Sequence, residues 1–209
     1  MPLNRDIAFT ATATVCLFVE RALGGPTTMA VFETIRKFFV PPHAPEPELV
    51  APAGPTTYTV RPLTSSQLEE VLRLNLRCFR NGENYTKHTF AFLLNEPGTL
   101  SFRVVDAAGS MVGFAFVMIN ENGAAHLTTI GVAPEHRRRG LAKKLLSHLE
   151  KALAAKKVET VVLEVRVGNT HAQGLYKTAG YNVVQRIASY YNNGEDCFLM
   201  MKSLVGTGN

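Results

Sequence analysis

The sequence has few cysteines and no cluster of metal-binding side chains. Its 3 cysteines, Cys16, Cys78 and Cys197, are an odd number without paired spacing. The 6 histidines are scattered, whereas a zinc site needs histidines and cysteines at short, regular intervals. We therefore expect no metal site, and the cysteine pattern fits a reducing, cytoplasmic setting.

The sequence also lacks an internal repeat, a membrane-spanning run and a nucleic-acid-binding motif. The mildly apolar residues 7–19 are interrupted by threonines and are too few to cross a bilayer. Lys+Arg 22 against Asp+Glu 17 leaves a net charge of +5, and the excess gathers around one turn, near residues 137–144. We therefore expect neither nucleic acid nor a membrane as partner; a basic helix that binds RNA or a membrane through this turn is the disfavoured alternative.

Residues 1–56 predict an N-terminal extension, flexible or partly helical, ahead of a folded domain at residues 57–203. Residues 41–55 are proline-rich and predict an extended linker. Met29 is a plausible translation start, because apolar residues at helical spacing follow it and would pack on the domain or on a partner; a signal peptide over residues 7–19 is the alternative. Residues 204–209 are a short tail. The sequence does not fix the oligomeric state, and we expect a monomer or a weak dimer.

The domain predicts an α/β fold with a mixed, mostly antiparallel sheet. Helices are expected at residues 65–79, 86–94, 140–157 and 169–180, and strands at residues 57–62, 100–106, 111–120, 124–132, 158–167, 181–189 and 196–202. Glycine-containing turns at residues 107–110 and 120–123 indicate hairpins between the early strands. The strand ending at residue 132, the long helix and the next strand form a parallel crossover.

A basic turn between that strand and the long helix predicts an anion site. The turn contains three successive arginines, and the helix begins at Gly140. The first amide groups of a helix have no partner within it, and the helix dipole places partial positive charge there. Such a terminus binds phosphate or pyrophosphate. The alternative is an exposed basic turn that only keeps the protein soluble.

Two side chains are unusual for their expected positions. Residues 158–167 predict a strand buried on both faces, yet one face carries Glu164 and Arg166. One interpretation is that this face lines a substrate channel and that Glu164 acts as a base. The alternative is a hydrated edge of the sheet, where Glu164 pairs with Arg166. Tyr176 points inward from the short helix, a pattern that by itself favours core packing over a catalytic role.

Together these segments resemble the GNAT superfamily of acetyl-CoA-dependent N-acetyltransferases. Residues 137–142 match the family turn Arg/Gln-x-x-Gly-x-Gly/Ala, with alanine as the allowed last residue. Residues 163–169 and 175–176 resemble the Leu-Glu-Val-Arg-x-x-Asn and Leu-Tyr segments of RimI-type ribosomal-protein-alanine acetyltransferases. Residues 83–85 (Glu-Asn-Tyr) and 190–196 (Tyr-Tyr-x-x-Gly-Glu-Asp) resemble N-terminal acetyltransferase A catalytic subunits. The resemblance implies the GNAT fold with helices on both faces of the sheet, acetyl-CoA as co-substrate, and transfer to the N-terminal α-amino group of a protein or peptide, a ribosomal protein among the candidates.

The resemblance also implies a role for each matching residue. Glu164 would accept the proton of the attacking amine, and Tyr176 would protonate the departing thiolate. Acetyl-CoA would be held by Ile130, Gly131, Val132, Arg137, Arg138, Arg139, Gly140, Leu141, Ala142, Lys143 and Asn169. The acceptor peptide would contact Glu83, Tyr85, Arg166, Tyr190 and Tyr191.

Two other functions stay open at this point. The same chemistry on a lysine, a polyamine or another small amine is disfavoured by the Tyr190–Tyr191 segment. A non-catalytic acyl-CoA-binding protein is disfavoured because Glu164, Asn169 and Tyr176 are all present.

Overall fold

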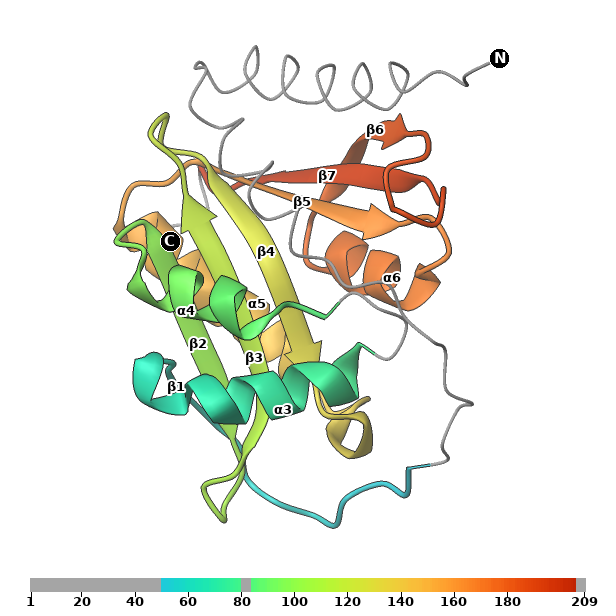
Figure 1. Cartoon of the computed structure of the whole chain (residues 1–209). Helices are drawn as coiled ribbons and strands as arrows, with labels where there is room; N and C mark the ends of the chain where they lie inside the picture. Colours follow the sequence, from blue (N-terminus) through green and yellow to red (C-terminus); the bar gives the residue numbers. More distant parts are fainter. Residues whose placement is uncertain (1–49, 80–83, 206–209) are drawn as a thin grey trace.

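The computed structural model describes residues 50–79 and 84–205 (Figure 1). The sequence predictions for residues 1–49, which include the Met29 helix, Cys16 and most of the linker, lie outside the described residues. The same holds for Glu83 and for most of the C-terminal tail. Within the described part of the chain, no helix is long and apolar enough to cross a membrane.

One mixed sheet organises the described residues. Its seven strands follow the order β1-β2-β3-β4-β5-β7-β6, and every neighbouring pair is antiparallel except β4 and β5. This confirms the predicted mixed, mostly antiparallel sheet and the crossover. The strands are β1 (Thr59–Pro62), β2 (Thr99–Val105), β3 (Met111–Ile119), β4 (Ala125–Val132), β5 (Thr160–Arg166), β6 (Asn182–Ile187) and β7 (Cys197–Ser203).

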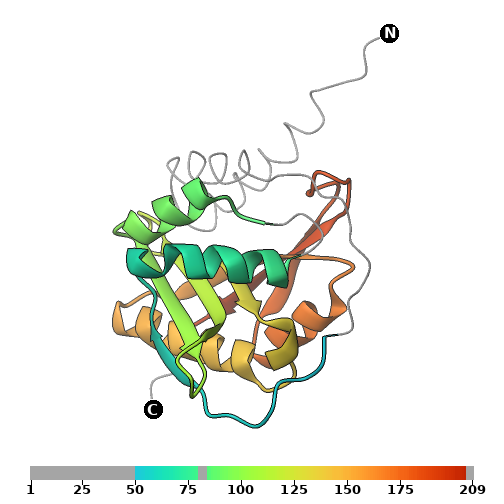
Figure 2. The ribbon, with the colours of Figure 1, turned by 60° about the horizontal axis from the view of Figure 1, so that its bottom comes forward.

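Helices cover both faces of the sheet. Helices α3 (Leu68–Cys78) and α4 (Lys87–Asn95) lie on one face, and α5 (Leu141–Ala155) and α6 (Thr170–Thr178) lie on the other, as Figure 2 shows. Short 3-10 turns, η1 (Ser65–Gln67) and η2 (Pro134–His136), precede α3 and follow β4. The expected strand at residues 181–189 ends earlier, at Ile187, because the chain turns at Ser189, whose φ is 51°.

The amphipathic pattern of α5 explains how it packs. Leu141, Leu145, Leu149 and Leu153 recur every four residues, and all are buried against the sheet. On the opposite face, Phe90 of α4 packs on the aromatic rings of Phe114 and Phe116. The core therefore lies on both sides of β3, whose first eight residues are buried.

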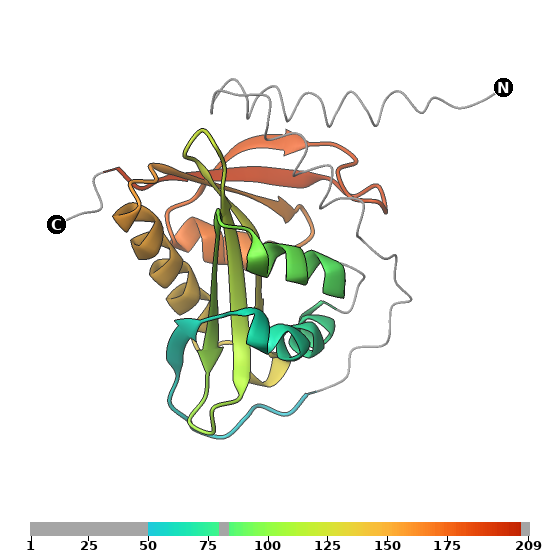
Figure 3. The same cartoon turned by 60° about the vertical axis from the view of Figure 1, so that its left-hand side comes forward.

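Strands β4 and β5 pair only at their beginnings. Their parallel ladder contains Ala125↔Val161 and His126↔Val162 and then ends, although both strands continue. The β3–β4 register shifts around Thr128, because Phe116 pairs with Thr129 while Val117 pairs with Leu127. A bulge of this kind bends its strand. Figures 1 and 3 show β4 and β5 running apart toward their C-terminal ends, so the later part of β4 has an edge that β5 does not cover.

Shortening a core leucine of α5 should destabilise the fold. Leu145→Ala removes a fully buried side chain and leaves a cavity, so we expect the free energy of unfolding to fall by about 2–5 kcal/mol. Lys151→Ala, on the exposed side of the same helix, should change it by less than about 0.5 kcal/mol. Urea unfolding of both variants measures the difference, and equal losses would contradict the packing described for α5.

Candidate active site

The turn before α5 has the backbone of an anion site. Arg138 and Gly140 both adopt left-handed conformations, with φ of 64° and 74°. The first α-helical hydrogen bond runs from Lys144 N to Gly140 O (2.9 Å), so the amide groups of Leu141, Ala142 and Lys143 have no acceptor within the helix. A Cβ at Gly140 would meet no atom within 4 Å. The turn thus presents open space beside free N–H groups, which fits a pyrophosphate.

The structure separates the three arginines of this turn. Arg137 donates from Nε to Val132 O (3.2 Å) and from Nη2 to Cys78 O (3.1 Å). Arg139 donates to backbone carbonyls of residues 53 and 54. Two guanidinium groups therefore fasten the turn to the rest of the protein, while the exposed Arg138 and Lys143 stand at the helix terminus. The sequence could not distinguish them, because the carbonyl partners come from distant segments.

Glu164 lies on β5, beside the point where β4 and β5 separate. Its Oε2 is 2.7 Å from Nε2 of His126, with side-chain exposures of 9% and 13%. Its Oε1 is buried and has no hydrogen-bond partner among the described residues. A buried acceptor in this state is costly unless water, a ligand or a substrate supplies its partner. This is the chemically most distinctive atom of the region.

Arg166 is not the partner of Glu164, so the predicted alternative of a Glu164–Arg166 pair is wrong. Arg166 donates from Nη1 to Glu195 Oε2 (2.7 Å) and Asn193 Oδ1 (3.1 Å), and its guanidinium lies 3.6 Å from the ring centre of Tyr191. Glu195 also accepts from Gly168 N (2.9 Å). Arg166 thus connects the end of β5 with the β6–β7 loop.

The reasoning from sequence missed His126 and Gln173. The pairing His126↔Val162 brings His126 within reach of Glu164, two residues further along β5, but strand register cannot be read from the sequence. Gln173 is buried in α6 and donates from Nε2 to the carbonyls of Arg166 (2.9 Å) and Val167 (2.8 Å). A buried glutamine inside a short helix was the available signal, and its role is to fix α6 against the end of β5.

Four buried tyrosines lie within range of the negative charge of Glu164. Tyr85, Tyr176, Tyr190 and Tyr191 come from the segment before α4, from α6 and from the β6–β7 loop. Burial raises the pKa of each phenol well above its usual value, and the negative charge of Glu164 raises each pKa further. At neutral pH all four phenols therefore stay protonated and can donate hydrogen bonds. Tyr85 donates one to Thr128 O (3.0 Å), at the bulge of β4.

Helix α6 carries both Tyr176 and Asn169. Asn169 is the N-cap, and its Oδ1 accepts from Ala172 N (3.1 Å). Tyr176 is 7% exposed and packs edge-on against Tyr181, with ring centres 5.8 Å apart. Both residues therefore have structural contacts, and the proposed cofactor and proton-donor roles are additional to them.

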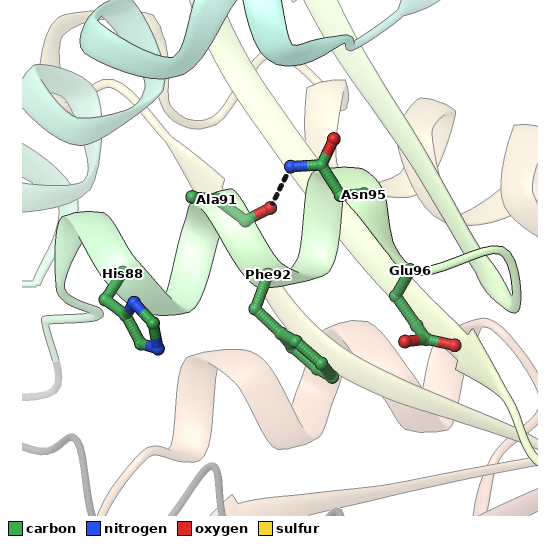
Figure 4. A pocket seen from close by; sticks show the side chains of 5 residues that line it. All are labelled: His88, Ala91, Phe92, Asn95 and Glu96. Carbon is green, nitrogen blue, oxygen red and sulfur yellow. Dashed lines mark hydrogen bonds between the residues drawn. The ribbon is translucent and has the colours of Figure 1, made fainter.

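A separate hollow of about 320 Å³ lies along α4 (Figure 4). It is lined by His88, Ala91, Phe92, Asn95 and Glu96, and Asn95 donates to Ala91 O (2.7 Å). None of the predicted site residues lines it. Glu164 and His126 lie instead where β4 and β5 separate. No group of three or more potential metal ligands is found among the described residues.

Known proteins share this arrangement of strands, turn and helices. Residues 68–181 match the acetyltransferase (GNAT) family. The chain belongs to this family. It is an acetyl-CoA-dependent N-acetyltransferase with the GNAT fold, as predicted.

Three known N-acetyltransferases are similar to this chain. The N-alpha-acetyltransferase of Sulfolobus acidocaldarius is 31% identical over 159 residues, covering 70% of this chain and 93% of the relative. The N-terminal acetyltransferase A complex catalytic subunit NAA10 of Arabidopsis thaliana is 32% identical, covering 72% and 80%. The crystal structure of the ribosomal-protein-S18-alanine N-acetyltransferase from Escherichia coli superimposes with a TM-score of 0.65 at 30% identity, covering 71% of this chain and 94% of that one.

The charge at position 140 should control the binding of coenzyme A. Gly140→Asp and Gly140→Asn introduce side chains of similar size that both tolerate a left-handed conformation, so they differ mainly in charge. We expect the aspartate to weaken binding at least about tenfold more than the asparagine, because it opposes the pyrophosphate at close range. Calorimetric titration with coenzyme A measures both dissociation constants.

Lys156→Gln is the control, because it lowers the net charge by the same single unit at the far end of α5. It should leave the affinity nearly unchanged. A loss as large as that of Gly140→Asp would point to general electrostatic attraction and contradict a site at the turn.

Proposed function

We propose that the protein transfers the acetyl group of acetyl-CoA to the N-terminal α-amino group of a protein or peptide. The observation that carries this proposal is the buried Oε1 of Glu164, an acceptor without a partner among the described residues, with four buried tyrosines within range of its negative charge. The relatives named above include N-alpha-acetyltransferases, which supports an α-amine as acceptor.

In this proposal one residue of the site accepts a proton and another donates one. Acetyl-CoA supplies an activated acetyl thioester. Nε2 of His126 holds Oε2 of Glu164 in place, which leaves Oε1 to accept the proton of the attacking amine, directly or through water. Tyr176, a buried phenol that is protonated at neutral pH, donates its proton to the departing sulfur as the C–S bond breaks. Free amide groups at the start of α5 hold the pyrophosphate.

An α-amine suits this modest base. A free α-amino group has a pKa of about 7.7–8.0, against about 10.4 for a lysine side chain. At neutral pH roughly a tenth of N-termini is already deprotonated, against fewer than about one in a thousand lysine side chains, so the lysine loses its proton at greater cost. Tyr190 and Tyr191 would donate hydrogen bonds to the peptide terminus, and Tyr85, whose hydroxyl donates to Thr128 O, would contact it with its ring. Glu83, outside the described residues, stays a prediction as a substrate contact.

The choice of acceptor protein is a finer proposal. A ribosomal protein is a candidate, because the similar Escherichia coli structure is that of a ribosomal-protein-S18-alanine N-acetyltransferase. Mutant forms of the spermidine/spermine N-acetyltransferase from Vibrio cholerae have the same fold at 21% identity, which supports the fold alone. We also propose a reducing, cytoplasmic setting, since Cys78 and Cys197 are free thiols and acetyl-CoA is required.

Loss of the Tyr176 hydroxyl should slow turnover without weakening cofactor binding. In Tyr176→Phe the ring still packs on Tyr181, so only the proton donor is lost. We expect kcat to fall about 10²–10⁴-fold, the usual contribution of a positioned acid, with the affinity for coenzyme A retained. Tyr181→Phe, which removes the phenol of the other ring in the pair, is the control and should keep its kcat. Equal rates for wild type and Tyr176→Phe under conditions where chemistry limits turnover would return Tyr176 to a packing role.

Glu164→Gln should lower the rate most at low pH. The substitution keeps the shape of the side chain and removes the base, and the rate should partly recover as rising pH deprotonates the substrate near its pKa of about 8. The measurement is kcat/KM against pH for wild type and variant, with the exposed Glu159→Gln as control. A pH-independent ratio between wild type and Glu164→Gln would remove Glu164 from the role of base.

The acceptor itself is tested with two peptides. One has a free N-terminal alanine, and the other has the same sequence with a blocked terminus and an internal lysine. Mass spectrometry of the products should locate the acetyl group on the free terminus. Equal or faster acetylation of the blocked peptide would overturn the assignment to N-termini while leaving the acetyltransferase chemistry intact.

A further inference from the structure

The segment that leads into β1 lies against the pyrophosphate turn. We call residues 53–58 the N-terminal strap. Its backbone donates from Ala53 N to Glu135 O (2.9 Å), just before the turn. Its carbonyls at Ala53 and Gly54 accept from the guanidinium group of Arg139, at 2.9 Å for Gly54. The strap lies outside residues 68–181, the part of the chain that matches the family.

Tyr58 is the centre of these contacts. Its hydroxyl accepts from Arg139 Nη1 (2.8 Å) and is 2.9 Å from Nδ1 of the buried His136. Its ring meets the His136 ring edge-on, with centres 5.8 Å apart. Its carbonyl accepts from Lys144 Nζ (2.6 Å), in the first turn of α5. One residue therefore contacts η2, the arginine turn and α5 together.

These contacts are made to a turn whose backbone conformation is unfavourable by itself. Arg138 and Gly140, on either side of Arg139, are both left-handed, which for an arginine costs free energy that surrounding contacts must offset. With its guanidinium held by the strap, Arg139 keeps the peptide groups between these two residues in place. The amide groups at the start of α5 are then oriented before any ligand arrives, which lowers the entropic cost of binding.

We propose that Tyr58 is a positioning residue for acetyl-CoA, which acts through Arg139 and His136 to hold the turn in its binding conformation. This inference rests on the pyrophosphate site at the turn and is independent of the identity of the acceptor. The proposal makes the N-terminal strap, which lies before the family match at residues 68–181, a determinant of the affinity for acetyl-CoA.

The test is Tyr58→Phe in the full chain, titrated calorimetrically with coenzyme A and no acceptor present. Loss of one hydroxyl that joins two partners should raise the dissociation constant about three- to tenfold. The KM for acetyl-CoA should rise in step, while kcat at saturating acetyl-CoA stays at the wild-type value, because no reacting atom is touched. Thr57→Val, which removes an exposed hydroxyl from the same strap, is the matched control and should bind like wild type.

Calorimetry also separates affinity from folding. The stoichiometry reports the fraction of folded molecules and the dissociation constant reports their affinity, so an unchanged dissociation constant overturns the proposal even if some protein unfolds. A fall in kcat at saturation with KM unchanged also overturns it.

A double variant tests the route of the effect. If Tyr58 acts through Arg139, adding Tyr58→Phe to Arg139→Gln should change the dissociation constant little beyond Arg139→Gln alone. Full additivity of the two effects would contradict that route. Failure of the pyrophosphate site itself is recognised separately, by equal affinities of Gly140→Asp and Gly140→Asn.

Discussion

The separation of β4 from β5 is the constraint on which the rest of the site depends. A parallel ladder that ends after two residue pairs leaves backbone groups of β4 without strand partners on that side. Strand-edge groups of this kind are available to a bound molecule, and two carbonyls of β4 already have side-chain partners: Thr128 O accepts from Tyr85 and Val132 O accepts from Arg137. The bulge at Thr128 bends β4 at this point, and Tyr85 reaches the bulge with its hydroxyl. The same distortion therefore exposes the strand edge and brings Tyr85 to it.

The second constraint is electrostatic. Glu164 is held in a largely buried position by a single histidine, and its second oxygen has no hydrogen-bond partner among the described residues. A fold selected for stability alone would replace it with an apolar residue, because Val162 on the same face of β5 shows that such a side chain fits there. The surrounding phenols, whose pKa values burial raises, offer neutral donors and add no further negative charge. The arrangement suits a base that must accept one proton in a region with little water.

The sequence predicts most of the fold because its signals are local. The leucines of α5 recur every four residues, glycines mark the hairpins, and Asn169 caps α6, so each element can be recognised from its own residues. Glu164 and Tyr176 were identifiable because each is unusual for its element. His126, Gln173 and Tyr58 were not, because their roles depend on strand register and on contacts between distant segments. Arg139 shows why local signals are insufficient, because the carbonyl of Gly54 that accepts its hydrogen bond lies 85 residues earlier in the chain.

The unsatisfied groups share one physical consequence. The amides at the start of α5 and the edge of β4 are available to a ligand, and the buried Oε1 atom of Glu164, without a partner among the described residues, lowers the stability of the protein without ligand. Where a bound co-substrate or acceptor supplies a partner to these groups, binding and stability are linked by mass action. Arg137, Arg139 and Gln173 hold the backbone around the site through its carbonyl groups, and His126 holds Glu164 itself. The fold can therefore keep its binding groups unpaired and still hold them in a fixed geometry.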